Sequence, residues 1–308
     1  MRPSSRLPHV ATAASSLLAT AALVLAMTLP APAAARDAKA AAPLPVPDWG
    51  TVSEPSPAPA RAIGGYALGC LGGALELPAT GPGYQVMRPS RNRAYGHPDL
   101  VAFVQSFAKK AKASGWPGLL VGDMAQPRGG PMPAGHASHQ SGLDVDIWFT
   151  PAPKRSLSVE ERNEISAVSM VKAGGGAIDP AVWSPGQVTL LRLAATAPEV
   201  ERIFVNGAIK KAACDAAGSD RQWLAKLRPW WGHTHHFHVR LKCPEGETAC
   251  LNQEPVPAED GCGAPLAEWL EAEAKARAEP KTPAAPSEPR RIELADLPPA
   301  CRGVLFGG

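Results

Sequence analysis

The sequence predicts an α+β fold, with a small central antiparallel sheet surrounded by helices and long loops. Helical and strand-like hydrophobic spacings both occur, but they do not alternate as regular βαβ units. Glycine and proline are abundant, with 29 and 34 among 308 residues, so many connections should be turns and loops. The six cysteines are an even number, which in an exported protein predicts three disulfides.

The first 35 residues have the pattern of an export signal. Arg2 and Arg6 make the start basic, the apolar run 13–29 follows, and Ala33–Ala35 offers small residues for cleavage. The apolar run is short for a membrane span, which needs about 20 residues. We therefore expect cleavage near Ala35 and a mature chain that is soluble, periplasmic and not stably inserted in a membrane.

The rest of the chain divides by composition into a core and two flanks. Residues 36–62 are rich in proline and alanine and predict a linker, and residues 63–262 form the compact region. Residues 263–308 comprise a helix, a proline-rich segment and a tail, which Cys301 would tie back to the body. The net charge of +3 comes mostly from the signal, so the mature surface gives no reason to expect a nucleic-acid partner.

Helices are predicted from apolar residues that recur on one helical face. The most regular set is Leu100, Phe103, Val104, Phe107 and Ala111. Proline at position 98 suits the first turn of this helix, and glycine at position 115 suits its end. Shorter helices are expected at 188–195 and 221–227, and a further helix at 264–278.

Four strands are expected in the core, at residues 118–121, 143–149, 202–205 and 236–241. In the last of these, alternation separates a polar face, with His236, His238 and Arg240, from an apolar face, with Phe237, Val239 and Leu241. The apolar face can pack on the core while two imidazoles and a guanidinium face a cleft. His233 precedes the strand, where alternation assigns it no face.

The segment 143–149 alternates in the same way and places Asp144 and Asp146 opposite its apolar residues. His139 precedes Asp146 by seven residues, with a glycine-containing turn between them, so both could reach one ion. With one more histidine they would form a set that leaves zinc an open position for a reactive water. Asp144 is the alternative carboxylate ligand. A lone histidine would more often be a surface or hydrogen-bonded group, but two dense clusters favour a catalytic metal site.

These motifs resemble a known group of enzymes. His139-x6-Asp146 followed by His236-x-His238 is similar to the zinc peptidases that include lysostaphin-type enzymes, D-Ala-D-Ala metallopeptidases and hedgehog domains. The longer strings QPRGGPMPAGHASHQSGLDVDIW and HFHVRLKCP resemble one branch, the penicillin-insensitive murein endopeptidases. The resemblance spans residues 63–262 and the ending LPPACRGVL.

The resemblance implies roles for five histidines and one aspartate. His139, Asp146 and His238 match the zinc ligands, His236 matches a histidine that assists catalysis, and His233 matches a further active-site histidine. His136 matches a motif histidine that we expect either to touch the active site or to bind an accessory zinc ion. The resemblance also implies three disulfides, Cys70–Cys301, Cys214–Cys262 and Cys243–Cys250.

Residues beside these motifs have two interpretations each. Asp123, Gln126 and Arg128 precede the first motif and would either contact substrate in the cleft or make hydrogen bonds within their loop. Trp230 and Trp231 would either line the cleft wall, stacking on peptide or sugar, or pack in the core.

By this resemblance, the chain is expected to be a zinc-dependent murein D,D-endopeptidase. It would hydrolyse D-alanyl–diaminopimelyl cross-links of peptidoglycan by metal-activated water. The alternatives are a D,D-carboxypeptidase acting on murein peptides and a catalytically silent murein-binding domain.

Ser169-Met-Val-Lys172 matches the SxxK pattern of penicillin-acylated enzymes, but no KTG motif accompanies it. A metal route offers no serine to acylate, so insensitivity to penicillin is expected. The sequence leaves a homodimer open.

Overall fold

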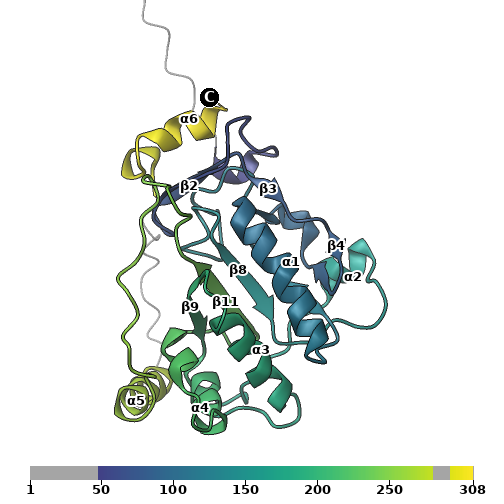
Figure 1. Ribbon diagram of the computed structural model, residues 1–308, viewed down its shortest axis with the longest axis vertical. Coiled ribbons are helices and arrows are strands. Elements are labelled where there is room, and N and C mark those ends of the chain that lie inside the picture. The colour runs from purple at the N-terminus through teal and green to yellow at the C-terminus, as the bar shows by residue number, and fades with distance from the viewer. Residues whose placement is uncertain (1–47, 280–291, 308) are drawn as a thin grey trace, which may run out of the picture. The chain divides into compact units, whose positions relative to one another are not determined.

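The computed structural model describes residues 48–279 and 292–307, so the predicted export signal lies outside the described residues. Its centre is a sheet of seven strands in the spatial order β10-β9-β11-β8-β7-β5-β4 (Figure 1). Their bounds are β4 (Thr80–Gly81), β5 (Tyr84–Val86), β7 (Leu119–Val121), β8 (Asp144–Trp148), β9 (Val200–Val205), β10 (Leu227–Pro229) and β11 (His236–Leu241). Two strand pairs flank the sheet, β1 (Arg61–Gly64) with β2 (Gly69–Gly72) and β3 (Leu75–Glu76) with β6 (Tyr95–Gly96).

The α+β class is confirmed, and the sheet is larger than predicted and mixed. The central strands β9, β11, β8 and β7 pair antiparallel, as expected. The outer pairs β10–β9 and β5–β7 are parallel, which the sequence did not reveal because β5 and β10 have only three residues each. All four predicted strands are present, within three residues of their expected bounds.

The described residues form six α-helices. They are α1 (Pro98–Ala113), α2 (Val159–Glu164), α3 (Pro185–Ala195), α4 (Gly207–Ala216), α5 (Ala264–Ala278) and α6 (Ala300–Phe306). The helices predicted at the positions of α1 and α5 are confirmed. The helix predicted at 188–195 begins earlier, where Ser184 and Gln187 form a capping box. The segment predicted as a helix at 221–227 is a 3-10 helix, Gln222–Lys226, that leads into β10.

Strands β8 and β11 carry the apolar face on which α1 packs. Their register places Val239 opposite Val145 and Phe237 opposite Ile147, and all four side chains are fully buried. Phe237 meets Phe107 of α1 edge-to-face, with ring centroids 6.4 Å apart. Burying each of these side chains contributes about 1.5–3 kcal/mol. Because side chains alternate along a strand, the polar residues of β8 and β11 must face away from α1.

Three disulfides are present among the described residues, and they pair as the resemblance implies. Cys70–Cys301 ties β2 to α6, Cys214–Cys262 ties α4 to the segment before α5, and Cys243–Cys250 closes a short loop after β11. Such bonds are typical of exported proteins. Among the described residues, no helix is long and apolar enough to cross a membrane.

Candidate metal centre

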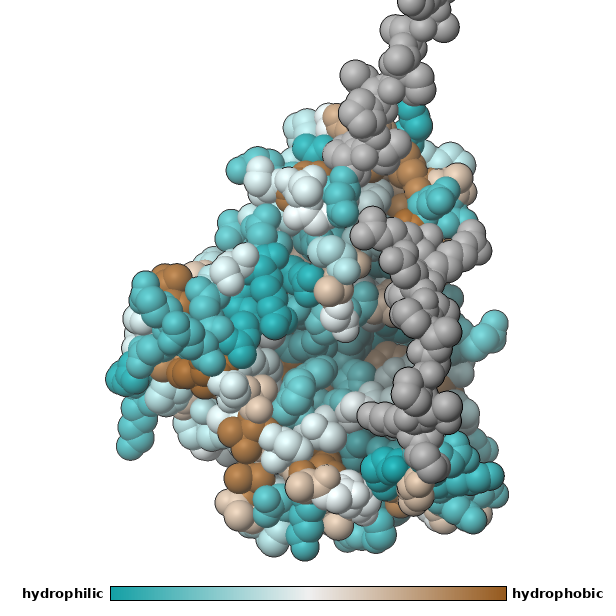
Figure 2. All heavy atoms as spheres, turned by 180° about the vertical axis from the view of Figure 1, so that it is seen from behind, coloured by the Kyte–Doolittle hydropathy of each residue, from teal (hydrophilic) through white to brown (hydrophobic). Residues whose placement is uncertain are grey.

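The register between β8 and β11 assembles the polar face of the sheet. It sets His238 opposite Asp146 and Arg240 opposite Asp144. This face lies away from α1, on the side seen in Figure 2, where a recess with largely hydrophilic walls crosses the middle of the molecule. The two histidine and aspartate clusters predicted from the sequence therefore meet on one surface.

His139 comes from the loop before β8 rather than from a strand. Its backbone adopts the left-handed conformation, with φ of 67°, and its amide donates to Asp144 Oδ2 at 3.1 Å. Gly142, also at positive φ, completes the turn into β8; a Cβ there would lie 2.4 Å from a Leu71 methyl group. The turn places the fully buried His139 ring beside Asp146.

Two imidazole side chains converge on one carboxylate oxygen. Asp146 Oδ1 lies 3.5 Å from His139 Nε2 and 3.2 Å from His238 Nδ1. The two imidazole rings lie 4.6 Å apart, centroid to centroid. The structure thus brings together the residues that the resemblance matches to zinc ligands.

Several polar atoms of this cluster are buried without a hydrogen-bond partner among the described residues. They include both ring nitrogens of His139 and Asp146 Oδ1. Leaving such an atom unpaired costs about 1–3 kcal/mol, so a concentration of them calls for an explanation. Imidazole nitrogens and a carboxylate oxygen are the donors that zinc prefers, so these residues fit a zinc ion.

The charge of the cluster also favours a cation. Burial alone lowers the pKa of His238, but the carboxylates of Asp144 and Asp146 outweigh it and raise that pKa to about 9. Two buried carboxylates therefore hold a proton on His238. A divalent ion would satisfy the same demand for positive charge, with the imidazole neutral.

Two sets of three side chains bring ligand atoms within 4.8 Å of one another, and both contain His139. One set adds His136 and Asp146, and the other adds Asp144 and His238. The expected ligands thus draw Asp146 from the first set and His238 from the second. Which of the two aspartates is the metal ligand therefore depends on their other contacts.

Asp144 is already engaged by protein donors. Arg240 donates to it twice, from Nε to Oδ1 at 2.8 Å and from Nη2 to Oδ2 at 2.7 Å. Burial raises the pKa of Asp144, but the Arg240 cation holds it well below its usual range. Asp144 Oδ2 also lies 3.2 Å from His238 Nε2. Asp144 is therefore placed to orient the His238 ring through Nε2. Asp146 is the carboxylate with an oxygen that accepts no hydrogen bond in the described structure.

His136 occupies the edge of the same cluster. Its Nε2 lies 3.0 Å from Asp123 Oδ2, and its Nδ1 lies 3.7 Å from Asp146 Oδ2. Asp123 is buried and also accepts from Arg91 and Arg93. Burial raises the pKa of Asp123, but His136 and the arginines bring it down to about 2. The two arginines were not predicted from the sequence to be site residues; the only signal for them was the basic run from 88 to 93.

Three more histidines line the other edge. His236 Nε2 lies 3.6 Å from Asp146 Oδ2, and its Nδ1 lies 2.8 Å from Nδ1 of His235. The His233 ring lies 4.9 Å from that of His236, and its Nδ1 donates to the Trp231 carbonyl at 2.8 Å. Burial lowers the pKa of His236 to about 3 and that of His233 to about 4. Both rings are therefore neutral at pH 7.

Gln126 and Arg128 are committed to backbone carbonyls instead of facing this cluster. The Arg128 guanidinium donates to the carbonyls of Val304 and Leu305 at the end of α6, at 3.2 and 2.6 Å. The buried Gln126 amide donates to the carbonyls of residues 129 and 131, both at 3.1 Å. These contacts agree with the second interpretation given for the two residues, in which they make hydrogen bonds to the protein and do not contact substrate.

Trp230 and Trp231 lie beside the histidines and are about half exposed, at 50% and 48%. Trp230 contacts Phe204 of β9, and Trp231 contacts Trp269 of α5 at 5.5 Å between ring centroids. Each tryptophan thus packs against one aromatic neighbour and keeps surface available to solvent.

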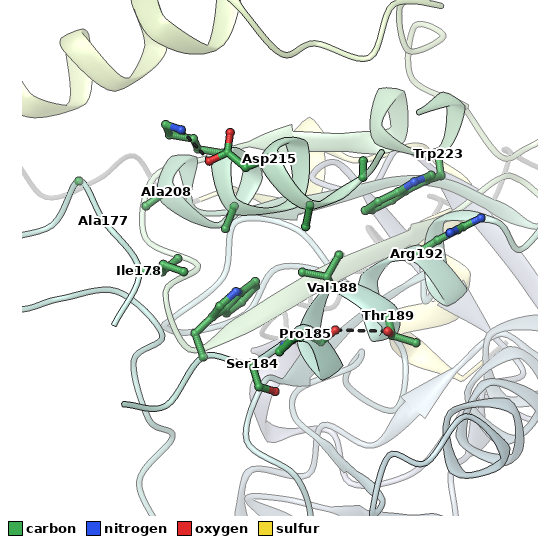
Figure 3. Close-up of a pocket in the computed structure, with 16 residues that line it drawn as sticks. Ala177, Ile178, Ser184, Pro185, Val188, Thr189, Arg192, Ala208, Asp215 and Trp223 are labelled. Atoms are coloured by element: carbon green, nitrogen blue, oxygen red, sulfur yellow. Dashed lines mark hydrogen bonds and ion pairs between the residues drawn. The ribbon is translucent and has the colours of Figure 1, made fainter. Parts of the chain in front are cut away.

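A separate cavity of about 760 Å³ lies between α3 and α4 (Figure 3). Trp183, Val188 and Trp223 form apolar parts of its lining, and Arg192 and Asp215 lie at its rim. None of the predicted site residues belongs to its lining. The concentration of titratable groups, not this cavity, therefore identifies the candidate site.

Known proteins are similar in sequence to this chain over most of its length. Residues 62–306 match the sequence model of the family described as penicillin-insensitive murein endopeptidase. Relatives of that name include the protein of Yersinia enterocolitica, 45% identical over 257 residues that cover 83% of this chain and 90% of the relative. That of Klebsiella pneumoniae is 44% identical over the same shares. That of Haemophilus influenzae is 45% identical over 252 residues, which cover 79% and 85%.

Proposed function

Because the chain belongs to the penicillin-insensitive murein endopeptidase family and is therefore a peptide hydrolase, we propose that it is a zinc-dependent D,D-endopeptidase. It hydrolyses the D-alanyl–diaminopimelyl cross-links of peptidoglycan in the periplasm. The observation that carries this proposal is the buried meeting point of His139, Asp146 and His238, where the His139 ring nitrogens and Asp146 Oδ1 lack hydrogen-bond partners within the described structure.

His139, Asp146 and His238 would hold the zinc ion, with His136 as an accessory ligand. When bound, the ion supplies a Lewis acid that activates water and polarises the scissile carbonyl. Asp144 fixes the His238 ring from behind, and Asp123 does the same for His136.

Two neutral histidines carry the proton transfers. His236 accepts a proton at Nε2, the nitrogen nearer to Asp146, because its Nδ1 already meets His235. It returns that proton to the amine that leaves when the peptide bond breaks. His233 donates its Nδ1 proton to the Trp231 carbonyl, so its Nε2 is the free acceptor. It stands beside His236 and helps to orient the attacking water.

The cleft wall beside these histidines includes Trp231 and Trp230, whose exposed surfaces stack on the substrate. Gln126 and Arg128 do not contact the substrate, because their donors already bind backbone carbonyls. Ser169 is likewise assigned no chemistry, since its hydroxyl donates to the Val171 carbonyl of its own turn. The reaction then has no serine for penicillin to acylate.

The test is incubation of the purified protein with defined cross-linked muropeptide dimers. The proposal predicts monomer products, at a rate unchanged by penicillin, abolished by a chelator and restored by zinc. Loss of only a terminal D-alanine would instead indicate a carboxypeptidase. Binding with unchanged substrate would indicate a silent murein-binding domain.

Location is tested separately from chemistry. The proposal places the mature protein in the periplasm, with its export signal removed near Ala35. Amino-terminal sequencing of the protein from periplasmic extracts should find a start close to residue 36. An intact start at Met1 in a membrane fraction would contradict it.

A further inference from the structure

The loop that carries His233 has an unusual backbone. It connects β10 to β11, and two successive residues, Gly232 and His233, have positive φ values of 69° and 49°. Glycine adopts this conformation readily, but a histidine does so at a cost. The His233 conformation therefore depends on contacts from the surrounding structure.

Asn206 supplies those contacts. Its backbone amide donates to the His233 carbonyl at 3.2 Å, and its side-chain Nδ2 donates to the Gly232 carbonyl at 3.0 Å. Its Oδ1 accepts from the Ala208 amide at 2.9 Å and so caps α4. One buried asparagine thus fixes the two residues with positive φ to the start of a helix.

Asn206 is in turn held by Glu273 of α5. Nδ2 also donates to Glu273 Oε1 at 3.1 Å, and Arg277 Nη1 lies 3.1 Å from the same oxygen. Glu273 is only 4% exposed, and its Oε2 has no hydrogen-bond partner in the described part of the chain. Packing alone would not call for a carboxylate here, because burying a charge with an unpaired oxygen is unfavourable.

Helix α5 approaches this point closely. A Cβ at Gly207, the first residue of α4, would lie 3.0 Å from Trp269 and 3.1 Å from Glu273 Oε2. Trp269 also meets Trp231 of the His233 loop. The loop is therefore supported by α5 in two ways, by ring contact at Trp231 and by hydrogen bonds through Asn206.

We propose that Glu273 is a positioning residue that acts through Asn206 and Gly232 to keep the His233 ring in the site. The ring lies 4.9 Å from that of His236 and 6.1 Å from that of His238. This inference rests on the proposed function for its kinetic consequence. Its structural part, control of the loop conformation by α5, stands independently.

Three variants of the full chain test the proposal. Glu273→Ala removes the acceptor for Asn206 Nδ2, Glu273→Gln keeps an acceptor oxygen without the charge, and Glu271→Ala is a control on the exposed side of α5. With muropeptide dimers, Glu273→Ala should lower kcat by about tenfold, the effect of one lost hydrogen bond in a buried network, and leave KM within about twofold. Glu273→Gln should restore most of kcat, and zinc content should be equal in all variants.

A second measurement does not depend on activity. In the metal-free protein, hydrogen exchange of the segment 230–235 should be about tenfold faster in Glu273→Ala than in the natural protein or Glu271→Ala. The core strand β11 should exchange at an unchanged rate. This readout also decides the inference if the natural protein fails to cleave the dimers, which would refute the proposed function alone.

Two results would overturn the inference. One is unchanged exchange of residues 230–235 in Glu273→Ala, since α5 would then not control the loop. The other is a Glu273→Gln variant as defective as Glu273→Ala in both readouts, since the charge paired with Arg277 would then matter and the hydrogen bond to Asn206 would not.

Discussion

Asp144 and Arg240 face each other across β8 and β11 and form a two-point ion pair, with Nε–Oδ1 and Nη2–Oδ2 distances of 2.8 and 2.7 Å. This pair uses both oxygens of Asp144. It leaves Asp146, two residues along the same strand face, as the carboxylate with an unpartnered oxygen. The ion pair therefore separates two aspartates that strand alternation alone leaves equivalent.

Substitution of the two aspartates should affect stability and zinc binding differently. Asp146→Asn should remove zinc and activity but preserve folding. Asp144→Asn should leave Arg240 buried without its partner and cost about 3–5 kcal/mol of stability. Through the disturbed His238 ring, it should also weaken zinc binding by about 10–100-fold. Thermal unfolding and metal titration of both variants check this; full zinc affinity in Asp146→Asn would contradict the ligand assignment.

Neighbouring histidines of β11 should separate metal binding from proton transfer. His238→Ala removes a proposed ligand, so zinc content and activity should both disappear. His236→Ala should keep most of the zinc but lower kcat by about 10²–10⁴-fold, the usual loss on removing a general acid–base group. Metal analysis and dimer hydrolysis on the same preparations give the comparison. A His238→Ala protein with full zinc and full rate would refute the ligand set.

The disulfides should differ in their contribution to stability. Cys70–Cys301 spans 231 residues, whereas Cys243–Cys250 spans 7. On the loop-entropy account, replacing the first pair by alanines should cost about 3 kcal/mol more than replacing the second. Urea unfolding of the two double variants measures this difference. Equal losses would show that the long disulfide does not act by restricting the unfolded chain.

Lys210 should make stability rise at alkaline pH. Its side chain is fully buried and donates to the Leu224 carbonyl at 2.6 Å, and burial lowers its pKa from 10.5 to about 8. Between these two values the unfolded chain binds a proton that the folded chain has lost, so raising the pH favours folding. Relative to Lys210→Met, the natural protein should gain on the order of 2 kcal/mol between pH 8 and pH 10. If the free energies of unfolding of the two proteins changed equally between pH 8 and pH 10, this prediction would be wrong.

The centre of the site follows from the sequence because strand alternation is a local property. The faces predicted for 236–241 and 143–149 are those observed: Phe237 and Ile147 are buried against the core, and His238 and Asp146 meet on the other face. The helix at 264–278 was also predictable, because its pattern is long and begins after a glycine.

What the sequence did not reveal depends on contacts between distant segments. Arg128 lies two residues after Gln126 in the motif region, yet its guanidinium caps α6, over 170 residues away. Asn206 and Glu273 have no motif around them, and only the packing of α5 against α4 joins them. The strand β5 was missed because its three residues are too few to show a period.

The central claim is that one zinc ion held by His139, Asp146 and His238 makes this chain a murein endopeptidase. The most direct test is to titrate zinc into the metal-free protein and follow cleavage of a muropeptide dimer. We predict no cleavage without metal and a rate that rises in proportion to bound zinc up to one equivalent. Full cleavage by the metal-free protein, or none at any zinc concentration, would contradict the claim.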